Sequence, residues 1–303
     1  MTPTTPPTIL VTGADGFVGR HVVARLAERD GGLRAMVRNA ATYHPAPGVE
    51  VVEADLAKPE SLTLAMEGVE VVVHCAAITA NLKEPYKGAY DAINRGGTEN
   101  LVRAAASSLV KRLVVMSGLG TQPAAAGTYM ATRWGMEEAV RNSAIPFVMI
   151  QPSVQFGNGA EFVAALGRLI KASPVVPLLG GGGLRFQPIW VEDVVSCIEK
   201  AIGDEKLSGQ AVAIGGSEYA TFSEIIDTIC VALGKRRLKA PLPLWVARLQ
   251  APVMALLPRP PLTKASLELF GFENTTEIDA VDKAFGFHPR GFREHLLAHG
   301  VEA

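Results

Sequence analysis

Short apolar runs and longer amphipathic segments alternate along the first half of the chain. The runs are rich in β-branched residues and are bounded by turn residues, which is typical of buried strands. They cover residues 8–13, 33–39, 49–55, 69–77, 112–118 and 146–152. Between them, apolar positions recur with helical spacing at residues 17–27, 91–109 and 129–143. Strands and helices in strict alternation predict an α/β fold, a doubly wound parallel sheet covered by helices on both faces.

Beyond residue 151 the pattern loosens. Glycine and proline become dense between residues 174 and 188, and the helical segment 221–235 follows without a regular strand partner. We therefore expect a main domain at residues 8–151 and a smaller C-terminal, substrate-side lobe at residues 152–303. The two are expected to interleave, because residues 187–195 and 210–216 have patterns that fit a return to the main sheet. Residues 1–7 are predicted to be a disordered tail rather than a signal peptide.

Composition narrows the class of partner. The 303 residues are 48% hydrophobic, with a formal net charge of -1 and a pI near 6.6, which gives no bulk attraction to nucleic acid or to an anionic membrane. The three cysteines lie far apart and form no metal-ligand or disulfide pattern, so a reducing cytoplasm and no metal are expected. The apolar segment 241–260 is broken by prolines and Arg248, and is predicted to be a buried or partner-facing helix rather than a transmembrane segment. The expected partner is a small molecule, another protein or a second copy of the chain.

The sequence TGADGFVG at residues 12–19 places three glycines directly after the first strand, where the first helix opens. Such glycines permit a tight turn, let the backbone approach a pyrophosphate and pack the helix against the strand. The helix N-terminus then offers N–H groups and the positive end of its dipole to phosphates. These observations predict a Rossmann-type dinucleotide site, against the alternative of a glycine-rich turn without a ligand. The residues assigned to it here are Gly13, Asp15, Gly16, Phe17, Val18 and Gly19.

The ends of the next strands suggest the rest of this site. Arg38 ends the second strand where an acid would bind an adenosine ribose, and no acid occurs between residues 33 and 43. A guanidinium suits a 2′-phosphate, so we favour NADP(H) over NAD(H), with a solvated strand-end arginine as the alternative. Asp55 is expected to meet the adenine amino group, with Leu56 facing the ring. Ala76 and Ala77 are small enough for a cofactor to lie against the backbone.

Seven motifs in order resemble the extended and atypical short-chain dehydrogenase/reductase superfamily over about residues 8–235. They are TGADGFVG, ADL, HCAA, NRGGTENLVRAA, VVMSGLG, YMATR and QPSVQFG. Within it, the motifs SGLG, FQPIWVEDV, AIGGSEYATFSEI and PPLTKASLELFGFENTTE are most similar to the group of the nucleotide-binding accessory subunit of respiratory complex I and its bacterial relatives.

The resemblance implies a helical tyrosine as general acid or base, with a lysine four residues later that lowers its pKa and binds the nicotinamide ribose. Here Tyr129 is followed by Arg133. Residues four apart share one face of a helix, so the cation still lies beside the phenol, but an arginine does not give up its proton. The alternative is an exposed tyrosine–arginine pair beside Trp134.

Further roles follow from the same resemblance. Ser117 is the candidate to hold the substrate oxygen, with Thr121 second, because the position two beyond the serine is Leu119. Asn94 is a structural or relay asparagine, or else a helix N-cap. Pro152 and Ser153 are expected to present backbone to the nicotinamide carboxamide.

Two functions remain open from the sequence. One is hydride transfer on a carbonyl, hydroxyl or nucleotide-sugar-like substrate, with Tyr129, Arg133 and Ser117 as the reacting set. The other is a non-catalytic NADP(H)-binding subunit or redox sensor, which the loss of the lysine and the apolar segment near residues 241–258 favour. Dinucleotide binding is common to both.

Overall fold

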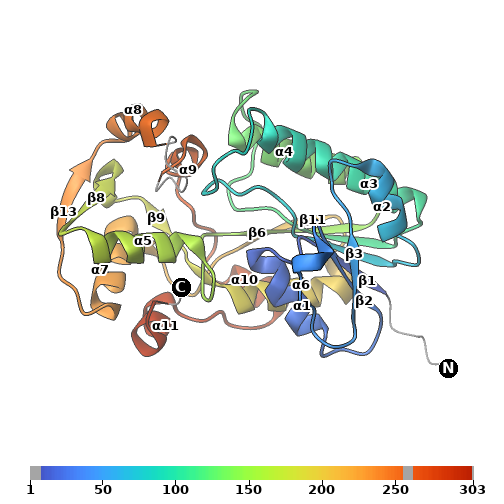
Figure 1. Cartoon of the computed structure of the whole chain (residues 1–303). Coiled ribbons are helices and arrows are strands. Elements are labelled where there is room, and N and C mark those ends of the chain that lie inside the picture. The colour runs from blue at the N-terminus through green and yellow to red at the C-terminus, as the bar shows by residue number, and fades with distance from the viewer. Residues whose placement is uncertain (1–7, 255–261, 302–303) are drawn as a thin grey trace.

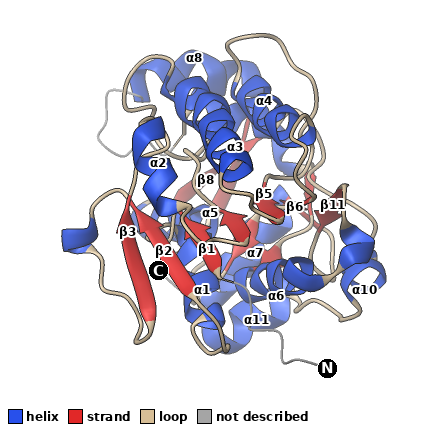
Figure 2. Cartoon of the chain, turned by 90° about the vertical axis from the view of Figure 1, so that its right-hand side faces the viewer, coloured by secondary structure: helices blue, strands red, loops and turns tan. Residues whose placement is uncertain are grey.

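The computed structural model describes residues 8–254 and 262–301. The tail expected at residues 1–7 and the last part of the segment 241–260 lie outside the described residues. Seven parallel strands form the main sheet in the order β11-β6-β5-β4-β1-β2-β3 (Figure 2). The strands are β1 (Ile9–Thr12), β2 (Leu33–Val37), β3 (Val49–Glu53), β4 (Val71–His74), β5 (Arg112–Met116), β6 (Phe147–Pro152) and β11 (Gln210–Ile214). The first six coincide with the six predicted strands, and the α/β class is confirmed.

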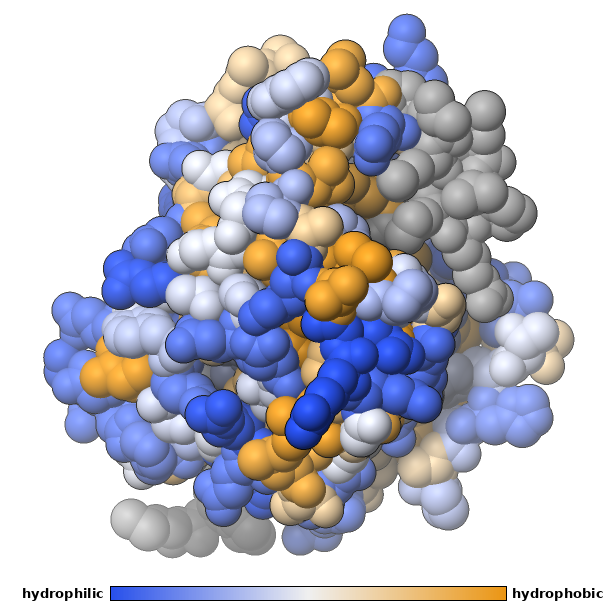
Figure 3. Space-filling model, turned by 90° about the vertical axis from the view of Figure 1, so that its left-hand side faces the viewer, coloured by the Kyte–Doolittle hydropathy of each residue, from blue (hydrophilic) through white to orange (hydrophobic). Residues whose placement is uncertain are grey.

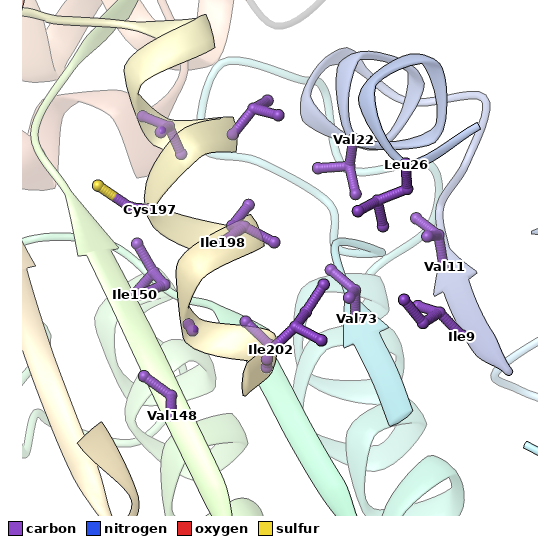
Figure 4. Packing of buried hydrophobic residues seen from close by; sticks show 14 of the residues in the cluster. Ile9, Val11, Val22, Leu26, Val73, Val148, Ile150, Cys197, Ile198 and Ile202 are labelled. Atoms are coloured by element: carbon purple, nitrogen blue, oxygen red, sulfur yellow. The ribbon is translucent and has the colours of Figure 1, made fainter. Parts of the chain in front are cut away.

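Helices cover both faces of the sheet, as the doubly wound pattern requires. One face carries α1 (Phe17–Leu26), α6 (Val191–Gly203) and α10 (Ala280–Phe285), and the other carries α2 (Pro59–Ala65), α3 (Gly97–Ser107) and α4 (Tyr129–Arg141). Side chains alternate between the two faces along each strand, so Ile9 and Val11 join the first buried cluster and Leu10 joins the second. Figure 4 shows Val22 and Leu26 of α1 directed toward Val11 and Val73 of the sheet.

The remaining elements form a second lobe around a third buried cluster (Figure 1). Its strands pair in twos, β7 (Gln155–Phe156) with β10 (Ile189–Trp190), β9 (Arg185–Phe186) with β12 (Ala220–Thr221), and β8 (Val175–Leu179) with β13 (Leu238–Leu242). Its helices are α5 (Glu161–Ala172), α7 (Phe222–Ala232), α8 (Leu244–Met254), α9 (Lys264–Leu269) and α11 (Phe292–His299). No helix within the described ranges is long and apolar enough to cross a membrane.

The chain passes between the two parts more than once. Residues 210–214 return to the main sheet as β11, which pairs with β6 in parallel, as its pattern suggested. The expectation for residues 187–195 is wrong, because β10 pairs with β7 and the following residues form α6. Only two residues of that segment are extended, and its apolar positions then serve a helix. The division at residues 151 and 152 stays a prediction.

Asn274 ties the C-terminal segment to the end of β6. It is 6% exposed, and its side-chain oxygen accepts hydrogen bonds from Ser153 Oγ at 2.8 Å and from the Val154 N–H at 2.9 Å. Its backbone oxygen accepts a bond from the Gln187 N–H at 3.0 Å. Through its side chain and its backbone, this one buried residue therefore joins the C-terminal segment to residues 153–154 and to residue 187.

Candidate active site

The glycine turn lies where the strand order reverses, between β1 and its neighbour β4. Gly13 has a φ of 64°, and a Cβ on it would lie 2.8 Å from the Ala76 Cα. A Cβ on Gly19 would lie 2.0 Å from the Gly13 carbonyl oxygen. Both positions therefore require glycine, and the turn approaches the end of β4 as closely as backbone allows. Ligands of open α/β sheets bind at such a reversal point.

The other residues assigned to the cofactor follow the carboxyl ends of strands and so lie along one edge of the sheet. Arg38 comes directly after β2 and is exposed, without an ion pair to any described carboxylate. Asp15 is exposed, Phe17 and Val18 are half-buried in the first turn of α1, and Ala77 is exposed.

Asp55 and Leu56, after β3, are placed differently from each other. The carboxylate of Asp55 accepts a hydrogen bond from the Ala57 N–H at 2.9 Å. Leu56 is 5% exposed and packs against Gly97, so its side chain belongs to the core. Its expected contact with the adenine ring stays a prediction, limited to the small exposed part of that side chain.

A chain of buried hydrogen bonds runs from β1 to the helix that carries Tyr129. Thr12 Oγ1 lies 2.7 Å from His74 Nδ1, and His74 Nε2 lies 3.1 Å from Thr98 Oγ1. Because Thr98 donates to the Asn94 carbonyl at 2.6 Å, it accepts from Nε2, and His74 is held as the neutral tautomer protonated there. Burial lowers the His74 pKa to about 4, so its charged form is excluded at neutral pH.

Asn94 continues this chain toward the tyrosine. It is 1% exposed and lies inside a π-helix, Asp91–Gly96, which precedes α3. Its side chain bonds both backbone groups of Ile78, at 2.8 and 3.0 Å, and reaches Thr132 Oγ1 at 3.5 Å. The N-cap alternative is wrong, because the π-helix begins after Tyr90, and Asn94 instead fixes the loop after β4.

Tyr129 and Arg133 lie together in a buried position on α4. Their exposed fractions are 8% each, and the guanidinium carbon is 6.0 Å from the phenol ring centroid. The guanidinium lies against Gly118, where a Cβ would meet Nη2. Among the described residues, Arg133 Nη2 has no hydrogen-bond partner. The alternative of an exposed surface pair is therefore wrong, and a buried donor is left free beside the phenol.

The environment of Tyr129 keeps the phenol neutral. Burial raises the Tyr129 pKa, opposed by the Arg133 charge and by a backbone hydrogen bond from Ala80. The pKa of Arg133 is lowered by burial, while Tyr129 and Glu137 act in the opposite direction. The arginine thus moderates the rise in the tyrosine pKa without reversing it.

Glu137 is a buried residue that the sequence did not single out. It is fully buried, and it accepts hydrogen bonds from Ser117 Oγ, from Gln151 Nε2 at 2.7 Å and from Arg141 Nη2 at 2.5 Å. The hydroxyl of Ser117 is therefore directed to this carboxylate. The signal in the sequence is the i, i+4, i+8 spacing of Tyr129, Arg133 and Glu137 on one helix face.

Thr121, the alternative to Ser117, and Leu119, which occupies the position expected for a hydroxyl, are also placed. Thr121 Oγ1 donates to the Gly118 carbonyl at 2.7 Å and lies 3.3 Å from Ser117 Oγ. Leu119 is 7% exposed. Thr121 and Ser117 are thus brought together after β5.

A short C-terminal helix covers Tyr129. The Glu268 carboxylate of α9 accepts hydrogen bonds from the backbone N–H groups of Tyr129 and Met130, at 3.1 and 3.0 Å. Thr263, the N-cap of α9, donates to the Ala80 carbonyl. Ala265 and Leu269 of this segment pack in one apolar cluster with Tyr129. The protein thus places its own carboxylate at the start of the tyrosine helix.

Pro152 and Ser153 have most of their backbone groups in use. The Pro152 carbonyl accepts a bond from Leu119, and the Ser153 N–H donates to the Ile214 carbonyl, both at 2.9 Å. The Ser153 hydroxyl donates to Asn274. Their expected contact with the nicotinamide carboxamide stays a prediction, limited to the backbone groups that are not already hydrogen-bonded within the protein.

A nicotinamide dinucleotide fits these residues. Gly13 gives close backbone approach at the reversal point, and no side chain of the described residues caps the N-terminus of α1. Arg133 adds a buried donor without a partner. Within the same ranges, no three His, Cys, Asp or Glu side chains are placed to hold a metal ion.

Comparison with known proteins agrees with this geometry. A family model described as NAD(P)H-binding matches residues 13–161. The chain is 30% identical to a ceramide reductase of Caulobacter vibrioides over 191 residues, 62% of this chain and 58% of that protein, which is less than two thirds of its length. It is 26% identical to a 3 beta-hydroxysteroid dehydrogenase/Delta 5-->4-isomerase of Mycobacterium tuberculosis, covering 93% of this chain and 86% of the relative.

Two further matches extend over nearly the whole chain. Identity to the NADH dehydrogenase [ubiquinone] 1 alpha subcomplex subunit 9 of Arabidopsis thaliana is 24%, covering 95% of this chain and 74% of that protein. A UDP-glucose 4-epimerase structure from Thermotoga maritima superposes with a TM-score of 0.73 at 17% identity, covering 96% of each chain. Residues 13–161 thus match an NAD(P)H-binding family, and over most of its length the chain is similar to reductases, dehydrogenases and NAD-dependent epimerases of the short-chain dehydrogenase/reductase type.

Proposed function

We propose that this protein is an NADP(H)-dependent oxidoreductase in which Tyr129 donates a proton to the oxygen of a carbonyl substrate. The observation that carries the proposal is the buried pair of Tyr129 and Arg133, with Arg133 Nη2 left without a partner. A buried guanidinium donor without a partner is costly in a folded chain. A ligand oxygen, such as a ribose hydroxyl, would relieve that cost.

The direction of the proton transfer follows from the tyrosine environment. Burial raises the Tyr129 pKa, so the phenol holds its proton at neutral pH and suits the role of general acid. A bound nicotinamide dinucleotide would supply the hydride. Arg133 stabilises negative charge that develops on the phenol oxygen, but it passes no proton onward. Reduction of a carbonyl is therefore favoured over oxidation of an alcohol.

Arg38 supports the preference for NADP(H). It is exposed directly after β2, at the edge where the glycine turn also lies. It forms no hydrogen bond or ion pair with the described part of the chain, so its guanidinium is free to bind a 2′-phosphate in a bidentate manner.

The surroundings of Tyr129 favour a mainly apolar substrate. The phenol packs with Ala80, Ala265, Leu269 and the Tyr90 ring, whose centroid is 5.2 Å from its own. The relatives named for ceramide and for 3 beta-hydroxysteroids are consistent with a carbonyl on a lipid-like molecule.

The test combines cofactor titration with a turnover assay. Wild type is expected to bind NADPH more tightly than NADH, and Arg38→Ala should remove most of that difference. Tyr129→Phe should retain NADPH binding and reduce carbonyl turnover by about 100-fold or more. Arg133→Lys, which keeps the charge, is the conservative comparison and should retain activity. Equal turnover by wild type and Tyr129→Phe would rule out the proton-donor role.

A second candidate is a dinucleotide-binding subunit without catalysis. Two observations favour it: Glu137 holds the Ser117 hydroxyl, and α9 covers Tyr129. The complex I subunit among the relatives is consistent with assembly with a protein partner. Tight NADPH binding together with no turnover of any carbonyl in a broad screen would support this candidate over the first.

A further inference from the structure

The cations of this chain are unevenly distributed. Residues 228–267 contain seven lysines and arginines and no aspartate or glutamate, in a chain whose formal net charge is -1. The segment runs from the end of α7 through β13 and α8 to the start of α9. A nearly neutral chain therefore contains a strongly basic stretch of sequence, of which Arg259 lies outside the described residues.

This region also exposes large apolar side chains. We call it the α8–β13 face and define it by Lys235, Arg236, Leu238, Trp245, Arg248 and Leu249. Leu238 is 73% exposed, Trp245 65% and Leu249 69%. Trp245 and Leu249 are four residues apart on α8 and so lie on one side of the helix. Several large, strongly exposed apolar side chains within one stretch of 12 residues are typical of an interaction site rather than of scattered surface residues.

The cations of the α8–β13 face are not neutralised by the protein. Lys239, close by, is bound to Asp227 at 2.7 Å. Lys235, Arg236 and Arg248 form no such pair with a carboxylate of the described residues. Figure 1 places α8 and β13 at one end of the molecule, away from the main sheet. Figure 3 views that end and shows strongly hydrophilic and hydrophobic residues side by side on it.

We propose that the α8–β13 face docks onto the surface of an anionic lipid bilayer. The first contribution is electrostatic, because cations without carboxylate partners attract anionic headgroups within a Debye length. The second is the apolar insertion of the exposed tryptophan and leucines. Tryptophan suits the headgroup region, and leucine side chains enter the acyl boundary beneath it.

The shape of the face selects a bilayer over an acidic protein. Its apolar side chains project from a helix and from a strand, each more than three-fifths exposed. Protein interfaces bury their aromatic anchors in pockets of matching shape, whereas a fluid bilayer accepts projecting side chains without such a match. Electrostatic attraction and shallow apolar insertion together give reversible binding.

Vesicle flotation of the full chain tests the proposal. The protein should float with vesicles of phosphatidylcholine and phosphatidylserine, float poorly with phosphatidylcholine alone, and be released by salt. The double variant K235Q/R236Q should bind the anionic vesicles roughly 30-fold more weakly, since each cation near such a surface contributes about a fivefold effect. The variant W245S/L249S should lose roughly tenfold or more from the apolar part.

Matched variants elsewhere on the surface are the controls. Leu64→Ser removes a leucine of similar exposure, 66%, from α2, and Arg29→Gln with Lys58→Gln removes two exposed cations outside the face. These should leave vesicle binding unchanged, and circular dichroism should show all variants folded. The proposal is overturned if anionic vesicles bind no better than neutral ones, or if control and face variants lose binding equally. Binding to polyglutamate but not to vesicles would also overturn it and assign the face to an acidic protein.

Discussion

Arg133 is a charge placed where the protein itself satisfies it only in part. Its guanidinium is buried against Gly118, four residues from Tyr129 on one side and four from Glu137 on the other. Glu137 is itself held by Ser117, Gln151 and Arg141. No described residue accepts a hydrogen bond from Arg133 Nη2, and under the proposed function a ligand oxygen accepts it.

The clearest pH effect at the level of single residues concerns His74. Its pKa in the folded chain is about 4, below the ordinary value of 6.5, so the unfolded chain binds the proton more tightly. The stability that the neutral imidazole contributes is complete above about pH 6.5 and is lost as the pH falls toward 4. The loss amounts to roughly 3 kcal/mol in the free energy of unfolding.

Urea unfolding of wild type and His74→Gln between these pH values measures this effect. Glutamine retains hydrogen-bonding groups but does not titrate, so the variant should show a shallower decline in stability at acid pH. His44→Gln, at an exposed histidine, is the control and should follow wild type. Parallel curves for wild type and His74→Gln would contradict the prediction.

Some residues were predictable from the sequence and others were not, for physical reasons. The glycine spacing of residues 13–19 requires a particular backbone, so it identified the turn directly. The spacing of Glu137 places it on the helix face of Tyr129 and Arg133, but its burial was not predictable, because a glutamate on a helix is usually solvated. Only the packing of α4 beside β6 and the end of β5 brings Ser117 and Gln151 to Glu137. The serine hydroxyl then donates to the Glu137 carboxylate.

Among the elements, the π-helix Asp91–Gly96 shows how local geometry orients a side chain. A π-helix holds more residues per turn than an α-helix. In this segment Asn94 bonds the Ile78 backbone and approaches Thr132 of α4. The extent of the π-helix could not be predicted from the sequence. Residues 91–109 have one continuous helical pattern, and that pattern does not distinguish π-helical from α-helical hydrogen bonding.

The contact between α9 and α4 gives a prediction at the same scale. Glu268→Gln removes a negative charge from the N-terminus of α4 and weakens its bonds to two backbone N–H groups. The charge and the two bonds both stabilise the start of α4 in wild type, so the variant should lose about 1 kcal/mol of unfolding free energy. Differential scanning calorimetry would show this loss as a lower midpoint.

The matched control for this variant is Glu28→Gln, an exposed residue just after the end of α1. It removes the same charge without touching a helix N-terminus and should stay within about 0.5 kcal/mol of wild type. If the two variants are equally stable, Glu268 does not act as a cap for α4.

For the whole molecule, the order of strands and helices up to residue 152 was predictable because local periodicity is strong there. The arrangement of the second lobe was not predictable. Its strands are short and pair in twos, such as β9 with β12, and its Gly- and Pro-rich segments show no periodic pattern of apolar residues. The placement of α9 over Tyr129 depends on contacts between residues more than 130 apart in sequence, and no local pattern encodes such contacts.

Asn274 gives a prediction for the connection between the two parts of the structure. Asn274→Ala leaves the Val154 N–H without its acceptor and removes one of the two acceptors of Ser153 Oγ. Leaving buried donors without a hydrogen-bond acceptor should lower the unfolding free energy by about 2 to 3 kcal/mol. Equilibrium urea unfolding measures it, with Asn81→Ala, an exposed asparagine, expected to match wild type. A loss no larger than that of the control would show that the two parts hold together without Asn274.

The return of β11 and α10 to the main sheet has a consequence for synthesis. β11 covers the β6 edge of the sheet, and Val281 and Phe285 of α10 complete the buried cluster over α1 and α6. While only the first 151 residues have left the ribosome, that edge is unpaired and that apolar face is uncovered. The nascent nucleotide-binding part is therefore an aggregation-prone intermediate, and it reaches its closed form only after residue 285 has emerged.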